Sequence, residues 1–342
     1  MKITTIGIDL AKNVFQVHGV DGHGNAVLRK KLDRVKMAEF FIKLPPCLIG
    51  MEACGSAHYW GRKLTGMGHT VKLMAPQFVK PYVKTNKNDI ADAEAICEAV
   101  SRPNMRFVPI KTDEQQAVLS LHRVRQSFIK VRTAQANQIR GLLSEFGTVI
   151  PQGIANITKH LPEMMEKSDL PSRFRDLLQR LCDHLKDIDK QVDEMDEKIQ
   201  QWHRSSETSR KLAEIPGIGP ITATALVASI GNAKNFVNGR QLAAWLGLVP
   251  RQHSSGGKSV LLGISKRGDT YLRTLLIHGA RAVIRFAENK PSTTWLNKLL
   301  SRRNKNVAAV ALANKNARVV WALLTREEQR FRSDYCPALA GA

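Results

Sequence analysis

The chain has 342 residues, of which 52 are Lys or Arg and 30 are Asp or Glu, and its formal net charge is +22 at pH 7. This length is enough for two or three domains, and 43% hydrophobic residues are enough for packed cores, which excludes a disordered chain. The surplus of positive charge predicts a polyanionic partner, because basic side chains that neutralise phosphates release condensed counterions.

Membrane attachment and disulfide bonding are not expected. No apolar run approaches the length of a membrane span, and the first residues, MKITTIGIDLAKN, are typical of a strand and not of a signal peptide. The five cysteines are scattered and show no CxxC spacing, which predicts free thiols in a reducing cytoplasm: Cys47, Cys54, Cys97, Cys182 and Cys336.

Residues 1–105 alternate strand and helix patterns. Three strands are expected first, and they are followed by helix, strand, helix, strand and a basic linker over residues 76–88. A further helix begins near Asp89, with Asn88 as its N-cap. This order predicts an α/β domain with a mixed sheet, because the first three strands can pair as antiparallel hairpins.

Residues 106–205 are predicted to be a helical linker and a coiled coil. Apolar residues in the second long helix alternate steps of four and three, the repeat of a coiled coil: Phe174, Leu178, Leu181, Leu185, Ile188, Val192, Met195, Ile199 and Trp202. Antiparallel packing against the preceding helix of the same chain would explain this seam. We favour a contact between chains, because the run is long for a helical hairpin within one chain.

Residues 206–342 are predicted to form a mostly helical domain. The segment IPGIGP resembles the turn of a helix-hairpin-helix unit, in which Gly217 and Gly219 allow backbone N–H groups to hold a phosphate. A plain turn between two helices explains the same residues equally well.

The segment RQHSSGGKSV, residues 251–260, is not a P-loop, because Gln252 stands where the first glycine would be required. It carries three hydroxyls, those of Ser254, Ser255 and Ser259, among basic residues: Arg251, His253, Lys258, Lys266 and Arg267. A serine can attack phosphorus if its proton is accepted and cations stabilise the developing charge. From these residues alone, a flexible phosphate-binding loop without a covalent role is the favoured interpretation.

Four acidic residues form an ordered set along the first domain. Asp9 lies on the first strand, Glu52 ends a later buried strand, and Asp89 and Asp92 share one face at the start of a helix. Converging carboxylates repel one another unless cations lie between them, and oxygen ligands suit Mg²⁺ or Mn²⁺. Two such ions stabilise the attacking and leaving oxygens of phosphodiester chemistry. The neighbouring lysines, Lys84 and Lys87, are expected to hold the phosphate backbone.

Together these motifs resemble the DEDD-type insertion-sequence transposases, which are related to the Piv-type DNA invertases. The likeness covers essentially the whole chain: GIDLAKN supplies Asp9, GMEACGSAHYW supplies Glu52, and KNDIADAEAI supplies Asp89 and Asp92. The resemblance implies a RuvC-like domain of the ribonuclease H fold over residues 1–105. It also implies a transposase domain over 206–342, in which the nucleophile is the serine directly before glycine, Ser255.

The resemblance further implies a bacterial recombinase that works in the cytoplasm at the nucleoid, guided by a noncoding RNA of its own element. That bridge RNA would pair with target and donor DNA. A homodimer would assemble to a tetramer, and strands would exchange through a phosphoserine and a Holliday junction.

Three alternatives stay open. A metal-dependent Holliday-junction nuclease would use water in place of Ser255, and a basic nucleic-acid scaffold would need no carboxylates. A sugar-kinase-like ATPase is disfavoured by the charge and by the missing phosphate-loop glycines.

Overall fold

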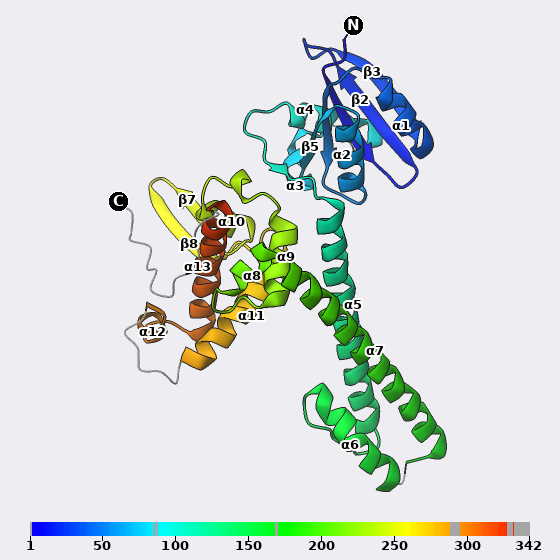
Figure 1. Ribbon diagram of the computed structural model, residues 1–342, viewed down its shortest axis with the longest axis vertical. Helices are drawn as coiled ribbons and strands as arrows, with labels where there is room; N and C mark the ends of the chain where they lie inside the picture. The colour runs from blue at the N-terminus through cyan, green and yellow to red at the C-terminus, as the bar shows by residue number, and fades with distance from the viewer. Residues whose placement is uncertain are drawn as a thin grey trace. The chain divides into compact units, whose positions relative to one another are not determined.

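The structure is a computed structural model, and it describes residues 2–84, 86, 88–167, 170–287, 295–326 and 331. The chain forms two compact units, residues 1–115 and 116–342. The first unit is an α/β domain with a mixed sheet, and the second unit is mostly helical, which confirms the predicted fold classes (Figure 1). Division into domains at residues 105 and 205 stays a prediction.

The first unit is built on a six-stranded sheet with strand order β3-β2-β1-β4-β5-β6. The first three strands pair antiparallel, as predicted, whereas β1, β4 and β5 are parallel neighbours. The short strand β6, which we did not predict, pairs antiparallel with β5. The strands are β1 (Thr5–Leu10), β2 (Val14–Val20), β3 (Ala26–Asp33), β4 (Leu48–Glu52), β5 (Thr70–Met74) and β6 (Phe107–Val108).

Helices cover both faces of this sheet. The helices α1 (Arg34–Ile42) and α2 (Ala57–Gly66) bury one face, where Ile8, Phe15 and Trp60 belong to one apolar core. The short helices α3 (Pro76–Val79) and η1 (Lys80–Tyr82) lead from β5 to α4 (Asp89–Val100), which packs over β1, β2 and β4.

Two glycines bring α4 close to the opposite face of the sheet. A Cβ added at Gly7 would lie 2.2 Å from the carbonyl oxygen of Ala93, and one added at Gly50 would lie 2.7 Å from the Cβ of Val100. Any side chain at Gly7 would therefore push the helix backbone off the strand. Gly7, the first residue of the GIDLAKN segment, thus fixes how closely α4 approaches.

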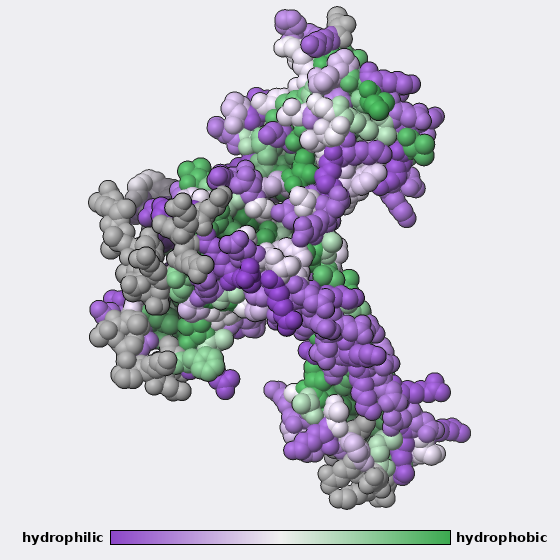
Figure 2. All heavy atoms as spheres, in the orientation of Figure 1, coloured by the Kyte–Doolittle hydropathy of each residue, from purple (hydrophilic) through white to green (hydrophobic). Residues whose placement is uncertain are grey.

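The second unit begins with a long helical hairpin. It consists of α5 (Asp113–Ser144), α6 (Ile154–Lys167) and α7 (Ser172–Ser205). The two long helices are antiparallel neighbours, because residues that ascend along α5 contact residues that descend along α7: Arg125 with Asp196, Arg132 with Asp189, and Gln135 with His184. In Figure 2 mostly hydrophilic residues cover the visible side of this hairpin.

The heptad seam of α7 is buried inside the chain. Leu178 and Leu185 share an apolar core with Ile139 and Leu143 of α5. Antiparallel packing within one chain is therefore the arrangement that the structure shows for this seam, and our preference for a contact between chains was wrong. The dimer and the tetramer stay predictions, and this seam no longer supports them.

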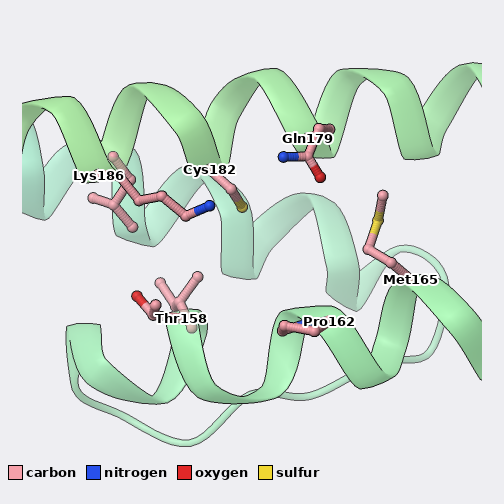
Figure 3. Close-up of a pocket in the computed structure, with 8 residues that line it drawn as sticks. Thr158, Pro162, Met165, Gln179, Cys182 and Lys186 are labelled. Atoms are coloured by element: carbon pink, nitrogen blue, oxygen red, sulfur yellow. The ribbon is translucent and has the colours of Figure 1, made fainter.

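A small cavity of about 230 Å³ lies between α6 and α7. Figure 3 shows Thr158 and Pro162 on α6 facing Gln179, Cys182 and Lys186 on α7. Burial raises the pKa of the Cys182 thiol to about 11, so this thiol stays protonated and unreactive at neutral pH. Cys182 is a free thiol, as are Cys47, Cys54 and Cys97, whereas Cys336 lies outside the described residues.

The rest of the second unit is a helical body around one apolar core, to which Leu226, Leu276 and Val320 contribute. Its helices are α8 (Glu207–Ala213), α9 (Pro220–Ile230), η2 (Ala233–Asn235), α10 (Gly239–Trp245), α11 (Thr270–Ala287), α12 (Trp295–Leu300) and α13 (Lys305–Thr325). Helix α13 is long and apolar enough to cross a membrane, which we did not expect, but Leu312, Ala313 and Ala317 on it are buried in this core.

The segment that we predicted as a flexible loop is a β-hairpin. The strands β7 (Pro250–Ser255) and β8 (Lys258–Ile264) pair antiparallel around Gly256 and Gly257. Both glycines have positive φ, +55° and +76°, which a two-residue turn of type I′ requires. The glycines therefore serve the turn of a hairpin.

Candidate active site

Asp9 and Glu52 lie side by side at the carboxyl ends of two parallel strands. Ile8 pairs with Met51 in the register of β1 and β4, so the next residues on the two strands are Asp9 and Glu52. Side chains alternate along a strand, and Gly7 contacts α4, so Asp9 also lies on the α4 side. The sheet therefore presents both carboxylates on one face.

Helix α4 begins at this same end of the sheet. Its Cys97 thiol donates to the carbonyl of Thr5, and Ala93 lies over Gly7, so the helix axis runs back along β1. One further turn toward the helix start reaches Asp89, beyond Gly7 and in the direction of Asp9. The Asn88 side chain accepts a hydrogen bond from the backbone N–H of Ala91 at 2.8 Å, which confirms the predicted N-cap.

The four acids thus share a face and an end of the sheet, but their side chains do not form one cluster. Across the part of the chain that the structure describes, no three His, Cys, Asp or Glu side chains form a group able to hold a metal ion. Burial raises the pKa of Cys54, and the carboxylates of Glu52 and then Asp9 raise it further, which places both carboxylates near this thiol. Asp9 and Glu52 are therefore the pair that the backbone brings together.

The predicted phosphate ligand Lys84 is engaged within the unit. Its Nζ lies 2.9 Å from Glu98 Oε2 and 3.9 Å from Glu94 Oε1, and the hydrogen bond to Glu98 raises the pKa of Lys84. With 64% of its side chain exposed, Lys84 can exchange this partner for a phosphate at little cost. Its contact with nucleic acid stays a prediction, and Lys87 lies outside the described residues.

The hairpin separates the candidate serines. Residues directly opposite in an antiparallel pair share a face, so Ser255, Lys258 and His253 lie on one face of β7–β8. Ser254 pairs with Ser259 on the other face. There the Gln252 Nε2 group donates to Ser254 Oγ at 2.7 Å and to Ser259 Oγ at 3.3 Å.

The base of the hairpin is tightly packed. A Cβ added at Gly247 would lie 2.2 Å from the carbonyl oxygen of Arg267, and one at Gly268 would lie 1.9 Å from that of Trp245. The buried guanidinium of Arg273 donates to the carbonyl oxygens of Leu246 at 3.2 Å and Arg267 at 3.0 Å. This contact between the Arg273 side chain and the two carbonyls was not predicted, although Gly247 and Gly268 were a signal of close backbone packing.

The remaining predicted basic ligands lie on or next to the hairpin. Arg251, Lys258, Lys266 and Arg267 are all exposed. Lys266 lies in the segment between β8 and α11 and has a φ of +54°, a conformation that is uncommon outside glycine. Phosphate binding by these side chains stays a prediction.

The glycine turn 215–220 has a packing role. A Cβ added at Gly279 on α11 would lie 1.8 Å from the carbonyl oxygen of Gly217, and the Asn316 side chain on α13 donates to the carbonyl of Pro216 at 2.9 Å. Interhelical packing thus explains Gly217. Gly219 is the N-cap residue of α9 and has open space around it, and phosphate binding at Gly217 and Gly219 stays a prediction.

A buried polar network joins α5 to the helical body. His122 is 1% exposed, and its ring nitrogens lie 3.0 Å from Tyr271 Oη and 3.0 Å from Thr224 Oγ1. Burial lowers the pKa of His122 to about 4, with Arg125 as a smaller cause, so the imidazole is neutral at pH 7. We did not predict this network, because a single histidine on a helix gives no signal of its partners.

Two segments of the chain match known transposase families. Residues 6–147 match the DEDD transposase family, and residues 209–295 match the Transposase IS116/IS110/IS902 family. A probable family 20 transposase of Pseudomonas aeruginosa is 56% identical over 332 residues, which cover 96% of this chain and 98% of the relative. This chain belongs to the IS116/IS110/IS902 transposase family.

Other members of this transposase family match along nearly the whole chain. The transposase for insertion sequence element IS1328 of Yersinia enterocolitica is 45% identical over 95% of this chain and 97% of its own length. The transposase for IS1111A of Coxiella burnetii is 46% identical over 95% of this chain and 91% of its own length. The first family match spans all four acids, and the second spans Gly217, Gly219 and Ser255.

Proposed function

We propose that this family member is the transposase of an insertion sequence and cleaves and rejoins DNA strands with Asp9, Glu52, Asp89, Asp92 and Ser255. The observation that carries the proposal is the register of β1 and β4, which sets Asp9 beside Glu52 at the end of the sheet toward which α4 begins. Two acids on neighbouring strands and two on a helix start are the arrangement expected of a divalent-ion site.

The donor set fits Mg²⁺ or Mn²⁺ in its chemistry, because all four ligands are carboxylate oxygens. The backbone supplies Asp9 and Glu52 as a pair, and Asp89 and Asp92 must turn toward them to complete the set. When bound, two such ions would neutralise the charge that develops on the attacking and leaving oxygens. Ion binding should therefore raise the unfolding temperature of the first unit.

Ser255 is the nucleophile in this proposal, and the hairpin supports it over its neighbour. The Ser254 hydroxyl accepts a hydrogen bond from Gln252 on one face, while Ser255 lies at the turn on the face of Lys258 and His253. Ser255 Oγ gives up its proton and attacks phosphorus, the bond between phosphorus and one ester oxygen of the DNA strand breaks, and that oxygen takes up a proton and leaves as a hydroxyl, so a phosphoserine forms. The terminal hydroxyl of another strand then loses its proton and attacks that phosphorus, the bond to Ser255 Oγ breaks, and the serine regains its proton, which leaves a Holliday junction.

The guide and the assembly belong to the same proposal. A noncoding RNA of the element would choose target and donor DNA by base pairing, and the net charge of +22 suits a chain that holds both nucleic acids. A dimer on each DNA would pair into a tetramer, in which the acids of one protomer meet Ser255 of another. The relation to Piv-type invertases, which also exchange strands, is part of the proposal.

A Holliday-junction nuclease without a covalent serine is the second candidate, because the acidic set alone supports hydrolysis by water. The two are separated by S255A, with S254A as the matched control one residue away. A recombinase loses strand transfer in S255A and keeps it in S254A, with DNA binding unchanged in both. Cleavage that survives S255A but not D9N would establish the nuclease, and activity that survives D9N would refute both.

A further inference from the structure

The edge strand β3 shares a face with the acidic pair. The register sets Lys31 opposite Gln16 and Gln16 opposite Asp9, so these three side chains form one row on the α4 side of the sheet. Arg29 stands beside His18 in the row that contains Gly7. Burial lowers the pKa of His18, and the nearby positive charge of Arg29 lowers it further, in keeping with the register that sets the two residues side by side.

These two cations are available to a ligand. Helix α4 packs over β1, β2 and β4, while Arg29 and Lys31 on the outer strand are exposed. Adjacent strands are about 4.8 Å apart, so Lys31 lies two strands and roughly 10 Å from Asp9. That separation equals about three nucleotide rises of one DNA strand. The next residue on this face, Asp33, lies 3.9 Å from the ammonium group of Lys36.

The electrostatics of this row favour a phosphate backbone. Carboxylates at Asp9 and Glu52 repel an approaching phosphodiester, so a strand that enters their site needs cations close by to hold its other phosphates. Lys31 and Arg29 supply two positive charges spaced along β3, on the side of the sheet where the acids lie. No base-reading group is needed for such a contact, because the backbone is the same in every sequence.

We propose that the α4-side face of β3 binds the backbone of the DNA strand that enters the Asp9–Glu52 site, with Lys31 and Arg29 as its phosphate ligands. This inference rests on the proposed function, because the acids determine where the strand must pass. It adds a sequence-independent DNA contact at the edge of the sheet.

Lys30 provides a control within the same strand. It follows Arg29 and precedes Lys31, and its side chain points to the opposite face, where its Nζ lies 5.0 Å from the centre of the Phe40 ring. K30A and K31A therefore remove the same charge from neighbouring positions on opposite faces. Exposed cation–π contacts are weak, so both variants are expected to fold, which thermal unfolding checks.

The experiment measures lysine modification by mass spectrometry on the full chain, purified from cells that carry its complete element. The probe is a DNA duplex with the element end, and a gel shift first establishes that it is bound. We expect bound DNA to protect Lys31 at least threefold more than Lys30. We also expect K31A, and not K30A, to weaken DNA binding by roughly three- to tenfold. In K31A the slope of the logarithm of the binding constant against the logarithm of the salt concentration should fall in magnitude by about one.

Two results would overturn the inference: equal modification of Lys31 and Lys30 in the bound complex, or protection of Lys31 by RNA alone with no further change on adding DNA. The D9N variant keeps this test separate from the proposed function. If strand transfer in the unmodified chain requires Asp9 while Lys31 stays unprotected, the function stands and the β3 contact fails. If the unmodified chain binds DNA and protects Lys31 but D9N transfers strands normally, the catalytic proposal fails instead.

Discussion

Replacing Gly7 with alanine tests how the sheet positions the start of α4. The new Cβ would lie 2.2 Å from the Ala93 carbonyl oxygen and 2.4 Å from the Cys97 backbone nitrogen, whereas ordinary contacts begin at 3.4 Å. Both obstacles are backbone atoms, so α4 must move away from β1 by about 1 Å. Overpacking of this kind costs about 1–3 kcal/mol, and we expect about 3 kcal/mol because no rotamer change relieves it.

The assay is thermal unfolding of the full chain, followed by a probe in the first unit such as Trp60 fluorescence. A loss of about 3 kcal/mol corresponds to roughly 10 °C in a unit of this size. G55A is the control, because a Cβ at Gly55 meets no atom within 4 Å. A shift in G7A no larger than that in G55A would refute the close approach of α4. We also expect G7A to weaken Mg²⁺-dependent stabilisation, because Asp89 moves with the helix.

Three further predictions concern the second unit and the metal site. The pKa of His122 lies near 4 when folded and 6.5 when unfolded, so the unfolded chain binds the extra proton: stability is intact above pH 6.5 and falls by about 3 kcal/mol as the pH approaches 4. Urea unfolding across this range should show a shallower fall in H122Q; identical slopes would contradict the assignment. R273M leaves the carbonyls of Leu246 and Arg267 without their donor, so hydrogen exchange in β7–β8 should rise several-fold while exchange in α13 does not; uniform exchange would count against this contact. Excess EDTA should abolish recombination and leave RNA binding intact, as filter binding would show; recombination in EDTA would exclude a metal role.

The coiled-coil seam shows where sequence periodicity stops being informative. The alternation of four and three correctly predicted a helix whose apolar edge is buried, and the α7 residues Leu178 and Leu185 are buried. It did not identify the partner, because helices of the same chain and of another chain offer the same apolar surface. The connection through α6 makes α5 the partner, and that is a property of the fold.

The segment with the three serines, residues 251–260, shows the same limit of what a sequence pattern can predict. Two adjacent glycines predict a tight turn, and the missing first glycine excludes a P-loop. By themselves the two glycines allow either a loop or a hairpin. Which serine faces Lys258, and which is bonded to Gln252, depends on cross-strand register, since a shift by one residue exchanges the two faces.

The sequence alone determined the order of the main elements from β1 to α4, without the short α3, η1 and β6, and it determined the N-cap at Asn88 and the four acids at strand ends and a helix start. These follow from local periodicity and capping chemistry. Only the tertiary structure decided that Asp9 lies beside Glu52, that α4 packs directly against Gly7, and that Lys31 lies on the same face of the sheet as the acids while Lys30 does not. Those facts depend on strand order and register, which join residues far apart in the chain, and no local pattern records them.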